Sequence, residues 1–333
     1  MSTLPPFIAA QPATSNRRGF FWIPGDLVET DAGTRQRGAM YVEWLAGAEV
    51  TKPVPLILIH GGGGQGTDWL GTPDGRPGWA QRFVDEGYLV YVVDRPGFGR
   101  SPYDEELLGR SQPSMSSETA SFLFAPQDAE DEHSQWPWGR TPGSRELEQL
   151  VAGQSFLFSD REFSQDLDAR RLVELLDTTG RAVLITHSAG APAGWLALNR
   201  RPDSVAGIVS VEPMAPPFAD IPGNELEWGL TSAPVVTDQA GSDAAQQQSQ
   251  LQAGDAKIAG FAGTAMLLLA GDASGFGRGT QAPTAEFLSA QGAHVEALNL
   301  ADRGIEGNGH GLILEKNSDE TIAPVLDWLD STL

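Results

Sequence analysis

Residues 182–195 read AVLITHSAGAPAGW, an apolar stretch typical of a buried strand that runs into a histidine, a serine and then small residues. An apolar stretch typical of a helix follows at once. A sharp turn from a strand into a helix exposes its central side chain above the sheet, in a strained backbone conformation. Thr186 stands where the common G-x-S-x-G form has its first glycine. The pattern predicts a nucleophile elbow with Ser188 as the nucleophile, the alternative being a serine that only caps the helix.

The composition limits the classes of protein and of partner. The chain has 333 residues, 40% of them hydrophobic, which allows a sizeable core and one large α/β domain. Its 44 acidic and 22 basic residues give a formal charge of −22, which repels nucleic acids and anionic membranes. There is no cysteine, no basic leader before a long apolar run, and no apolar run near the ~20 residues that span a bilayer. We expect a cytoplasmic protein without nucleic-acid or membrane partners.

Short apolar strands alternate with helical stretches through most of the chain. The strands that this alternation predicts are 19–23, 39–47, 54–60, 88–94, 182–186, 204–212, 264–272 and 294–300. Strands that are apolar on both faces and are joined by helices are typical of a parallel sheet covered on both sides. The predicted fold class is α/β, with a mostly parallel, twisted central β-sheet flanked by helices.

The predicted domain plan has one arm, one domain and two insertions. Residues 1–18, rich in proline, serine, threonine and alanine, are expected to form an N-terminal arm, and residues 19–333 a single domain. Residues 102–163 contain scattered proline, serine and aromatic residues without a clear period. A stretch of this length in a compact domain is usually functional, so we interpret it as a cap or lid over the sheet. A second insertion is expected at 213–261.

The serine needs a base, because a hydroxyl is a poor nucleophile at neutral pH. In proteins with such an elbow the base is a histidine that follows the nucleophile and the acid along the chain. Of the five histidines, His310 is the one that follows the last predicted strand, in GNGHGLILEKN (307–317). The glycines at 307, 309 and 311 let this loop fold back towards Ser188. We therefore predict that His310 is the base.

Two acidic residues compete for the third position. Asp272 follows a strand at the place that the commonest layout uses, and topology alone favours it. Glu212 ends the preceding strand, and its longer side chain suits an acid that starts from a neighbouring strand. Asp272 could instead cap its own loop by accepting hydrogen bonds from the backbone. The residues by themselves leave both possibilities open.

The glycines of HGGGG (60–64) follow a predicted strand. An oxyanion hole needs backbone N–H groups aimed at charge that develops in the transition state, and glycine lets the backbone come close to the substrate. We predict that the amides of Gly62 and Ala189 form it, with Gly61 as the other candidate and as part of the pocket. The chain has no G-x-x-x-x-G-K-[ST] motif and no G-x-G-x-x-G motif that opens a helix, so these glycines do not indicate a phosphate site.

Several longer stretches resemble the bacterial alkaline esterase family of the α/β-hydrolase superfamily. They are GFFWIPG, IHGGGGQGTDWLGTPDGRPGWAQRFVDEGYLVYVVDRPGFGRS, HSQWPW, LITHSAGAPAGWLALNRRPDSVAGIVSVEPMAPPF and GNGHG. The resemblance implies a triad of Ser188, Glu212 and His310, carboxylesterase activity on small or medium esters, no metal or organic cofactor, and a homodimer. Ala189, Ala191 and the extra glycine of HGGGG depart from the family pattern, which affects the acyl preference more than the chemistry.

Trp69, Gln135 and Trp136 are the predicted pocket residues, supplied by the oxyanion loop and the cap, with core packing as the alternative for each tryptophan. The expected reaction is acyl transfer to water, with a small-molecule ester as the partner. The alternatives are a lactonase, amidase or lyase of the same fold, and a non-catalytic homologue that only binds a ligand.

Overall fold

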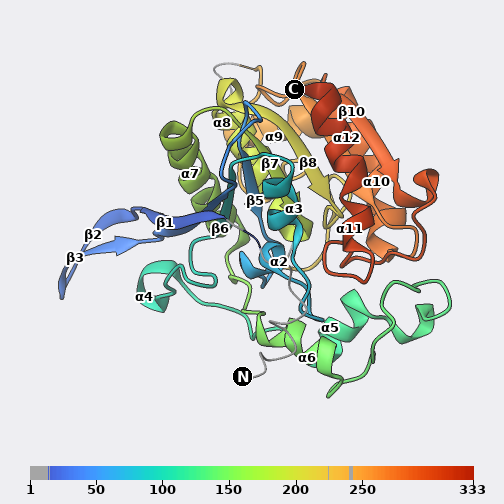
Figure 1. Ribbon diagram of the computed structural model, residues 1–333. Coiled ribbons are helices and arrows are strands. Elements are labelled where there is room, and N and C mark those ends of the chain that lie inside the picture. Colours follow the sequence, from blue (N-terminus) through green and yellow to red (C-terminus); the bar gives the residue numbers. More distant parts are fainter. Residues whose placement is uncertain (1–13, 15, 224, 240–242) are drawn as a thin grey trace.

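The computed structural model describes residues 14, 16–223, 225–239 and 243–333. Its centre is an eight-stranded sheet with the strand order β1-β4-β6-β5-β7-β8-β9-β10 (Figure 1). The strands are β1 (Arg17–Ile23), β4 (Met40–Ala46), β5 (Leu56–Ile59), β6 (Val90–Asp94), β7 (Ala182–His187), β8 (Val205–Val211), β9 (Ala265–Ala270) and β10 (His294–Asn299). The pairs from β6 to β10 are parallel, and β1 and β4 add two antiparallel pairs at one edge. The predicted α/β fold with a mostly parallel sheet is confirmed.

Helices cover both faces of this sheet and enclose two hydrophobic cores. The first core receives side chains from α3 (Trp79–Asp85) and α12 (Ala323–Thr332), and the second from α7 (Arg161–Thr179), α8 (Ala191–Arg200), α9 (Ala244–Ala253) and α10 (Gly275–Ala290). Every residue of β5, β7 and β8 is buried, which explains why their sequences are apolar or small except for His187 at the end of β7. No helix in the described part of the chain is long and apolar enough to cross a membrane.

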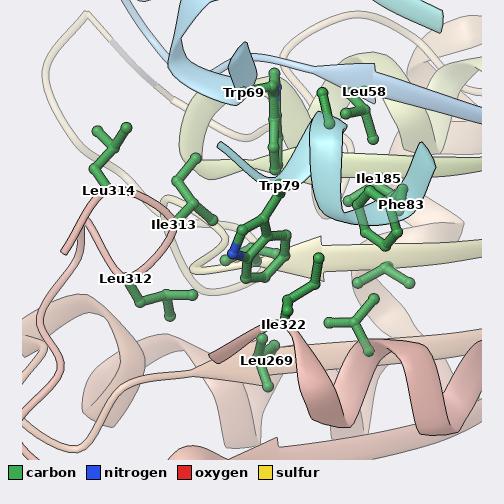
Figure 2. Packing of buried hydrophobic residues seen from close by; sticks show 14 of the residues in the cluster. Leu58, Trp69, Trp79, Phe83, Ile185, Leu269, Leu312, Ile313, Leu314 and Ile322 are labelled. Carbon is green, nitrogen blue, oxygen red and sulfur yellow. The ribbon is translucent and has the colours of Figure 1, made fainter. Parts of the chain in front are cut away.

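The segment that follows His310 packs into the first core (Figure 2). Leu312, Ile313 and Leu314 are buried in the same cluster as Trp79. The indole Nε1 of Trp79 also donates a hydrogen bond to the carbonyl oxygen of Ser318, at 2.9 Å. The short helix α11 (Ser318–Thr321) begins at that residue and leads into α12. The loop of His310 is therefore held to the body of the protein on its C-terminal side.

The predicted cap contains short helices. These are α4 (Glu105–Leu108), α5 (Ser117–Phe124) and α6 (Arg145–Ala152), and α5 and α6 lie side by side at one end of the sheet (Figure 1). Helix α7 begins at Arg161, slightly before the predicted end of the cap, because Asp160 caps it by accepting a hydrogen bond from the Phe163 amide. The second predicted insertion contains helix α9 among its described residues. The division into one domain with two insertions stays a prediction.

A projecting hairpin was not expected from the sequence. It consists of β2 (Asp26–Thr30) and β3 (Gly33–Arg37), and it extends away from the sheet beyond β1 (Figure 1). Its strands are too polar to show the apolar alternation that predicts a half-buried strand. Ion pairs from Arg170 and Arg171 to Asp26 hold its base to α7. Strand β1 starts within the predicted N-terminal arm, and residues 1–13 and 15 of that arm lie outside the described residues.

The elbow between β7 and α8 depends on two glycines. Ser188 has φ 50°, the strained left-handed conformation that the motif predicts. A Cβ atom added at Gly190 would lie 2.4 Å from the carbonyl oxygen of His60, so only glycine lets α8 approach the end of β5. A Cβ atom added at Gly194 would lie 2.8 Å from Cγ2 of Thr186. Gly194 thus provides the space that Thr186 takes in place of the usual glycine.

We predict that Gly194→Ala lowers the free energy of unfolding and that the loss depends on Thr186. Overpacking a buried contact costs about 1–3 kcal/mol, against at most ~1 kcal/mol gained when alanine replaces glycine in a helix. Thr186→Ser removes Cγ2 but keeps the hydroxyl that bonds Ser210 at 3.2 Å. Urea unfolding measures the free energy of unfolding of each variant. The loss in the double variant should be smaller than the sum of the two single losses, by about 0.5 kcal/mol or more.

Gly279→Ala is the matched control. Gly279 lies exposed within α10, and an added Cβ atom there meets no atom within 4 Å. It should raise the free energy of unfolding by about 0.5–1 kcal/mol through helix propensity alone. Strict additivity of the losses at 186 and 194 would contradict the proposed compensation.

Candidate active site

Three distant segments meet at Ser188. His310 lies in the loop after β10, and its Nε2 is 2.9 Å from Oγ of Ser188. Glu212 follows β8 directly, and its Oε2 is 3.3 Å from Nδ1 of His310. In this arrangement an imidazole can take the proton of the hydroxyl while a carboxylate faces the other ring nitrogen. The structure therefore brings the three predicted residues together in the predicted order.

Glu212 is held as an acceptor from several sides. Its side chain is buried, and its backbone has φ 51°, an uncommon conformation for a residue other than glycine. Oε1 accepts a hydrogen bond from the amide of Gly271 at 2.7 Å, and Oε2 accepts one from Oγ of Ser274 at 2.5 Å. Buried carboxylates persist when such donors replace water. Ser274, which also caps α10, is a residue of the site that the sequence did not reveal.

Asp272 has a different task. Its Oδ1 accepts hydrogen bonds from the amides of Gly307 and Asn308, at 2.9 and 3.1 Å. These two residues precede His310 in the glycine-rich loop, so Asp272 anchors that loop through its backbone. The structure places Glu212 against the imidazole, whereas topology alone had favoured Asp272. Asp272 accepts backbone hydrogen bonds, as the alternative expected, but from the loop of His310 and not from its own loop.

The glycine loop lies beside the elbow. A Cβ atom added at Gly61 would lie 3.2 Å from Cβ of Ser188, and one added at Gly62 would lie 3.1 Å from Cβ of Ala189. The backbone of this loop therefore runs close to the nucleophile, as an oxyanion hole requires. A side chain at either position would make an unusually tight contact with the elbow.

Two buried groups hold the glycine loop in place through the carbonyl oxygen of Gly61. Burial, reinforced by the positive Arg95, lowers the pKa of His60 to about 3, so its ring is neutral. Nε2 of His60 accepts from the amide of Arg95 at 3.0 Å, which leaves Nδ1–H to donate to Gly61 at 2.9 Å. The guanidinium of Arg95 donates to the same carbonyl at 2.7 Å and pairs with the buried Asp168 at 2.8 Å. Both His60 and Arg95 are therefore structural supports of the glycine loop.

The surroundings of His310 orient its ring. Burial and the neighbouring His310 lower the pKa of His187 to about 3, so His187 brings no positive charge to the site. Its Nε2–H donates to the carbonyl oxygen of His310 at 2.9 Å. The rings of Phe276 and Phe124 lie 4.5 and 5.5 Å from that of His310, measured between centroids. Aromatic packing of this kind was not predicted.

A cavity of about 360 Å³ opens at the nucleophile. Most of its lining is apolar: Met115, Leu123, Phe124, Leu150, Leu157, Met214, Ile221, Phe276, Ile313 and Leu314. Gly61, Gly62, Ser188, Ala189 and His310 also line it. Asp68 is its acidic group; burial, with a contribution from the negative Asp94, raises the pKa of Asp68 to about 7. A second cavity of about 640 Å³ adjoins it at His310 and Phe276.

The predicted pocket needs correction at three positions. Among the described residues that line the cavity at Ser188, Trp69, Gln135 and Trp136 are absent. Trp69 is buried against Trp79, with ring centroids 6.0 Å apart, and Trp136 is buried against Trp138 at 5.0 Å. The amide nitrogen of the Gln135 side chain donates to the carbonyl oxygen of Glu306 at 3.0 Å. The two tryptophans form cores, and the glutamine joins the cap to the loop of His310.

The stretch around Arg76 has a role that the sequence did not indicate. Its guanidinium donates to the carbonyl oxygen of Glu315 at 2.7 Å and to Oγ of Ser318 at 3.1 Å. TPDGRPGW (72–79) therefore supports the segment that follows His310. Within the described residues, no three His, Asp or Glu side chains converge in a way that could hold a metal ion.

The chain is similar to known hydrolases over nearly its whole length. The family model described as alpha/beta hydrolase fold matches residues 54–234. A curated fungal protein, the probable secreted lipase phiG of Fungal sp. (strain ATCC 74256), is 33% identical over 339 residues, with 95% of this chain and 90% of that protein covered. The solved structure of a novel bacterial esterase superimposes with a TM-score of 0.71 at 22% identity, with 97% of this chain and 98% of that chain covered. This chain belongs to the α/β-hydrolase family.

Proposed function

We propose that the protein is a serine carboxylesterase that hydrolyses small or medium esters through an acyl-enzyme. The observation that carries this proposal is the line of contacts from Ser188 to His310 and on to Glu212, beside a glycine loop that approaches the nucleophile. The names of the fungal lipase and the bacterial esterase support ester bonds as the target. A receptor that only binds ligands has no need of a base within reach of the serine.

Each group has a definite part in the proposed reaction. Nε2 of His310 takes the Ser188 proton as Oγ attacks the ester carbonyl, and Glu212 stabilises the imidazolium that forms. The amides of Gly62 and Ala189 donate to the oxyanion. His310 then gives its proton to the leaving alcohol. Water, activated by the same imidazole, attacks the acyl-enzyme and releases the acid.

The apolar lining supports an apolar acyl group as the part of the substrate that enters the cavity at Ser188. Burial of a methylene group contributes about 0.8 kcal/mol, so such a cavity favours acyl chains longer than acetyl until it is full. The adjoining cavity shares His310 and contains the charged side chains of Glu132 and Arg278. We infer that the alcohol leaves on this more polar side, where His310 can protonate it.

Partners and location stay proposals. The formal charge of −22 supports a small-molecule ester and water as the partners in place of nucleic acids or anionic membranes. A homodimer and a cytoplasmic location stay predictions. The name of the fungal relative describes that protein as secreted. Fractionation of the producing cell into cytoplasm and medium tests the predicted location of this chain.

Hydrolysis of p-nitrophenyl esters and labelling with a fluorophosphonate test the proposed function. The protein should cleave butyrate and hexanoate esters and gain one phosphonyl group at Ser188. Ser188→Ala should lower kcat by at least about 10⁴-fold and abolish labelling. Ser289→Ala, at an exposed position of α10, is the control. An unlabelled Ser188 would favour the non-catalytic alternative, and faster cleavage of lactones or amides would redirect the substrate class.

Two isosteric variants test the acid. Glu212→Gln removes the charge beside His310 and should lower kcat by about 10³-fold or more, since loss of the triad acid costs about 10⁴ in a comparable protease. Asp272→Asn keeps an oxygen that can accept hydrogen bonds from Gly307 and Asn308. Its kcat should therefore fall by less than about tenfold. Steady-state kinetics near pH 8 measures both. The reverse order of losses would transfer the role of triad acid to Asp272.

The raised pKa of Asp68 predicts a pH-dependent stability. Between about pH 4 and pH 7 the folded protein keeps a proton on Asp68 that the unfolded chain has lost, so stability from this group falls as the pH rises through that window. Asp68→Asn should therefore raise Tm more at pH 8 than at pH 5. Asp128→Asn, at an exposed residue of the adjoining cavity, is the control. Equal effects of Asp68→Asn at both values of pH would contradict the assignment.

A further inference from the structure

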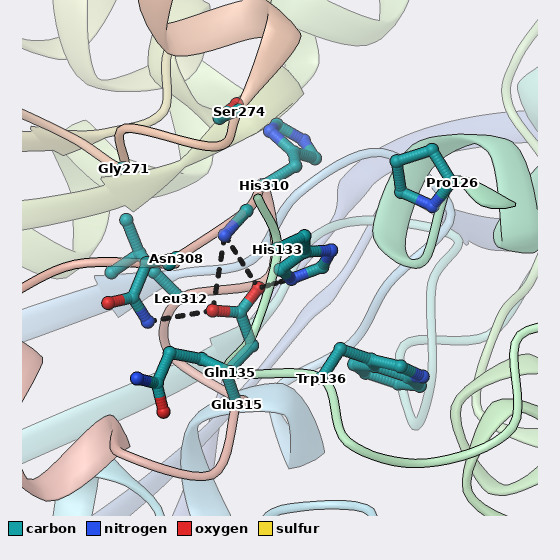
Figure 3. A network of polar contacts seen from close by, with 12 residues as sticks. Pro126, His133, Gln135, Trp136, Gly271, Ser274, Asn308, His310, Leu312 and Glu315 are labelled. Atoms are coloured by element: carbon teal, nitrogen blue, oxygen red, sulfur yellow. Dashed lines mark hydrogen bonds and ion pairs between the residues drawn. The ribbon is translucent and has the colours of Figure 1, made fainter. Parts of the chain in front are cut away.

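A second buried carboxylate, that of Glu315, contacts the loop of His310 from outside the triad (Figure 3). Its Oε1 accepts a hydrogen bond from the amide of Gly309 at 3.0 Å, and its Oε2 accepts one from Nδ2 of Asn308 at 2.7 Å. These are the two residues that come immediately before His310. Glu315 therefore holds the backbone from which the imidazole projects, while Glu212 contacts the ring itself.

The cap reaches the same carboxylate through a histidine. His133 is fully buried, and its Nε2 is 2.8 Å from Oε1 of Glu315 (Figure 3). The guanidinium of Arg140 lies 3.2 Å from Nδ1 of His133. Because a guanidinium can only donate, Nδ1 must accept and Nε2–H must donate to Glu315. Arg140 also donates to the carbonyl oxygens of His133 and Trp136, at 2.6 and 3.0 Å, and so fixes the local shape of the cap.

The backbones of the cap and the loop are in direct contact here as well. The amide of Gln135 donates to the carbonyl oxygen of Gly307, and its own carbonyl oxygen accepts from the amide of Lys316, both at 3.0 Å. A Cβ atom added at Gly309 would lie 2.7 Å from ring atoms of His133. Gly309 is thus needed so that His133 of the cap can lie against the loop. The sequence alone had explained this glycine only by the flexibility of the loop.

Glu315 is itself fixed to the body of the protein. Its carbonyl oxygen accepts the hydrogen bond from Arg76, and the residues on its N-terminal side are packed in the core around Trp79. One residue therefore connects three parts of the molecule: the core, the cap and the loop of the base. A carboxylate in this place resists displacement, because the amide of Gly309 and Nε2–H of His133 would be left buried without a partner.

We propose that Glu315 is a positioning residue for the catalytic imidazole, and that His133 and Arg140 couple the position of the cap to it. This inference rests on the proposed function, in which His310 is the base. A misplacement of about 1 Å at a reacting group can cost about 10² in rate. The contacts on both sides of the His310 ring, at 2.9 and 3.3 Å, leave little tolerance for such a shift.

Glu315→Gln tests the proposal at constant side-chain volume. The new amide places a donor against the donors of Asn308, Gly309 or His133, which should shift the loop. We expect kcat for p-nitrophenyl butyrate to fall about 10- to 100-fold with KM changed less than about twofold, and the rate of fluorophosphonate labelling to fall in parallel. Glu306→Gln, an exposed position in the same loop, is the matched control. A purely structural role would lower Tm and leave kcat of the folded variant unchanged.

His133→Gln and the double variant test the coupling to the cap. His133→Gln should lower kcat at least threefold, and its effect should largely disappear when Glu315 is already glutamine, because both act through one contact. A kcat of Glu315→Gln within twofold of the parent overturns the proposal. If Glu315→Gln does not fold, the kcat of His133→Gln is the test, and a value within twofold of the parent overturns the proposal. Activity of Ser188→Ala would instead refute the proposed function, so the two failures are distinguishable.

Discussion

The close approach of α8 to the ends of β5 and β7 is the constraint on which the rest of the site depends. Gly190 permits it, since any side chain there would meet the carbonyl oxygen of His60. The same approach forces Ser188 into its left-handed conformation and presents Oγ above the sheet. His60 also begins the glycine loop, so a single packing requirement places both the nucleophile and the groups that would stabilise the oxyanion.

Acidic side chains hold the loops that meet at this point, each through its own donors. Asp168 holds Arg95, which holds the glycine loop. Asp272 and Glu315 hold the loop of His310 through its backbone, and Glu212 is the acid that contacts the imidazole. A buried carboxylate without such partners would be costly. These carboxylates have the same chemistry, and the donors around each of them determine whether it holds a loop or faces the imidazole.

The sequence predicted what depends on local pattern. The apolar strands, the elbow and the order of serine and histidine follow from periodicity and glycine placement, and the structure agrees with them. The choice between Glu212 and Asp272 came only from a resemblance, because both acids follow neighbouring strands at the same edge. Which of them faces His310 depends on Ser274 and on the amides of the histidine loop, contacts between segments that no local pattern encodes. The burial of Trp69 likewise depends on Trp79 and could not be read from its own neighbours.

The cap shows why sequence position is a poor guide to role in this chain. Gln135 and Trp136 looked like pocket residues because they belong to an aromatic segment in an insertion, yet this segment is bonded to the loop of the base by backbone and side chains. The cap's own contribution to the pocket lining comes instead from helices α5 and α6 and their flanking residues, such as Phe124 and Leu150. One part of the cap therefore lines the cavity at Ser188, while another is hydrogen-bonded to the loop of His310. Changes in the first part alter the space open to an ester, and at Phe124 they also alter the packing of the His310 ring. Changes in the second part reach the imidazole through the loop that carries it.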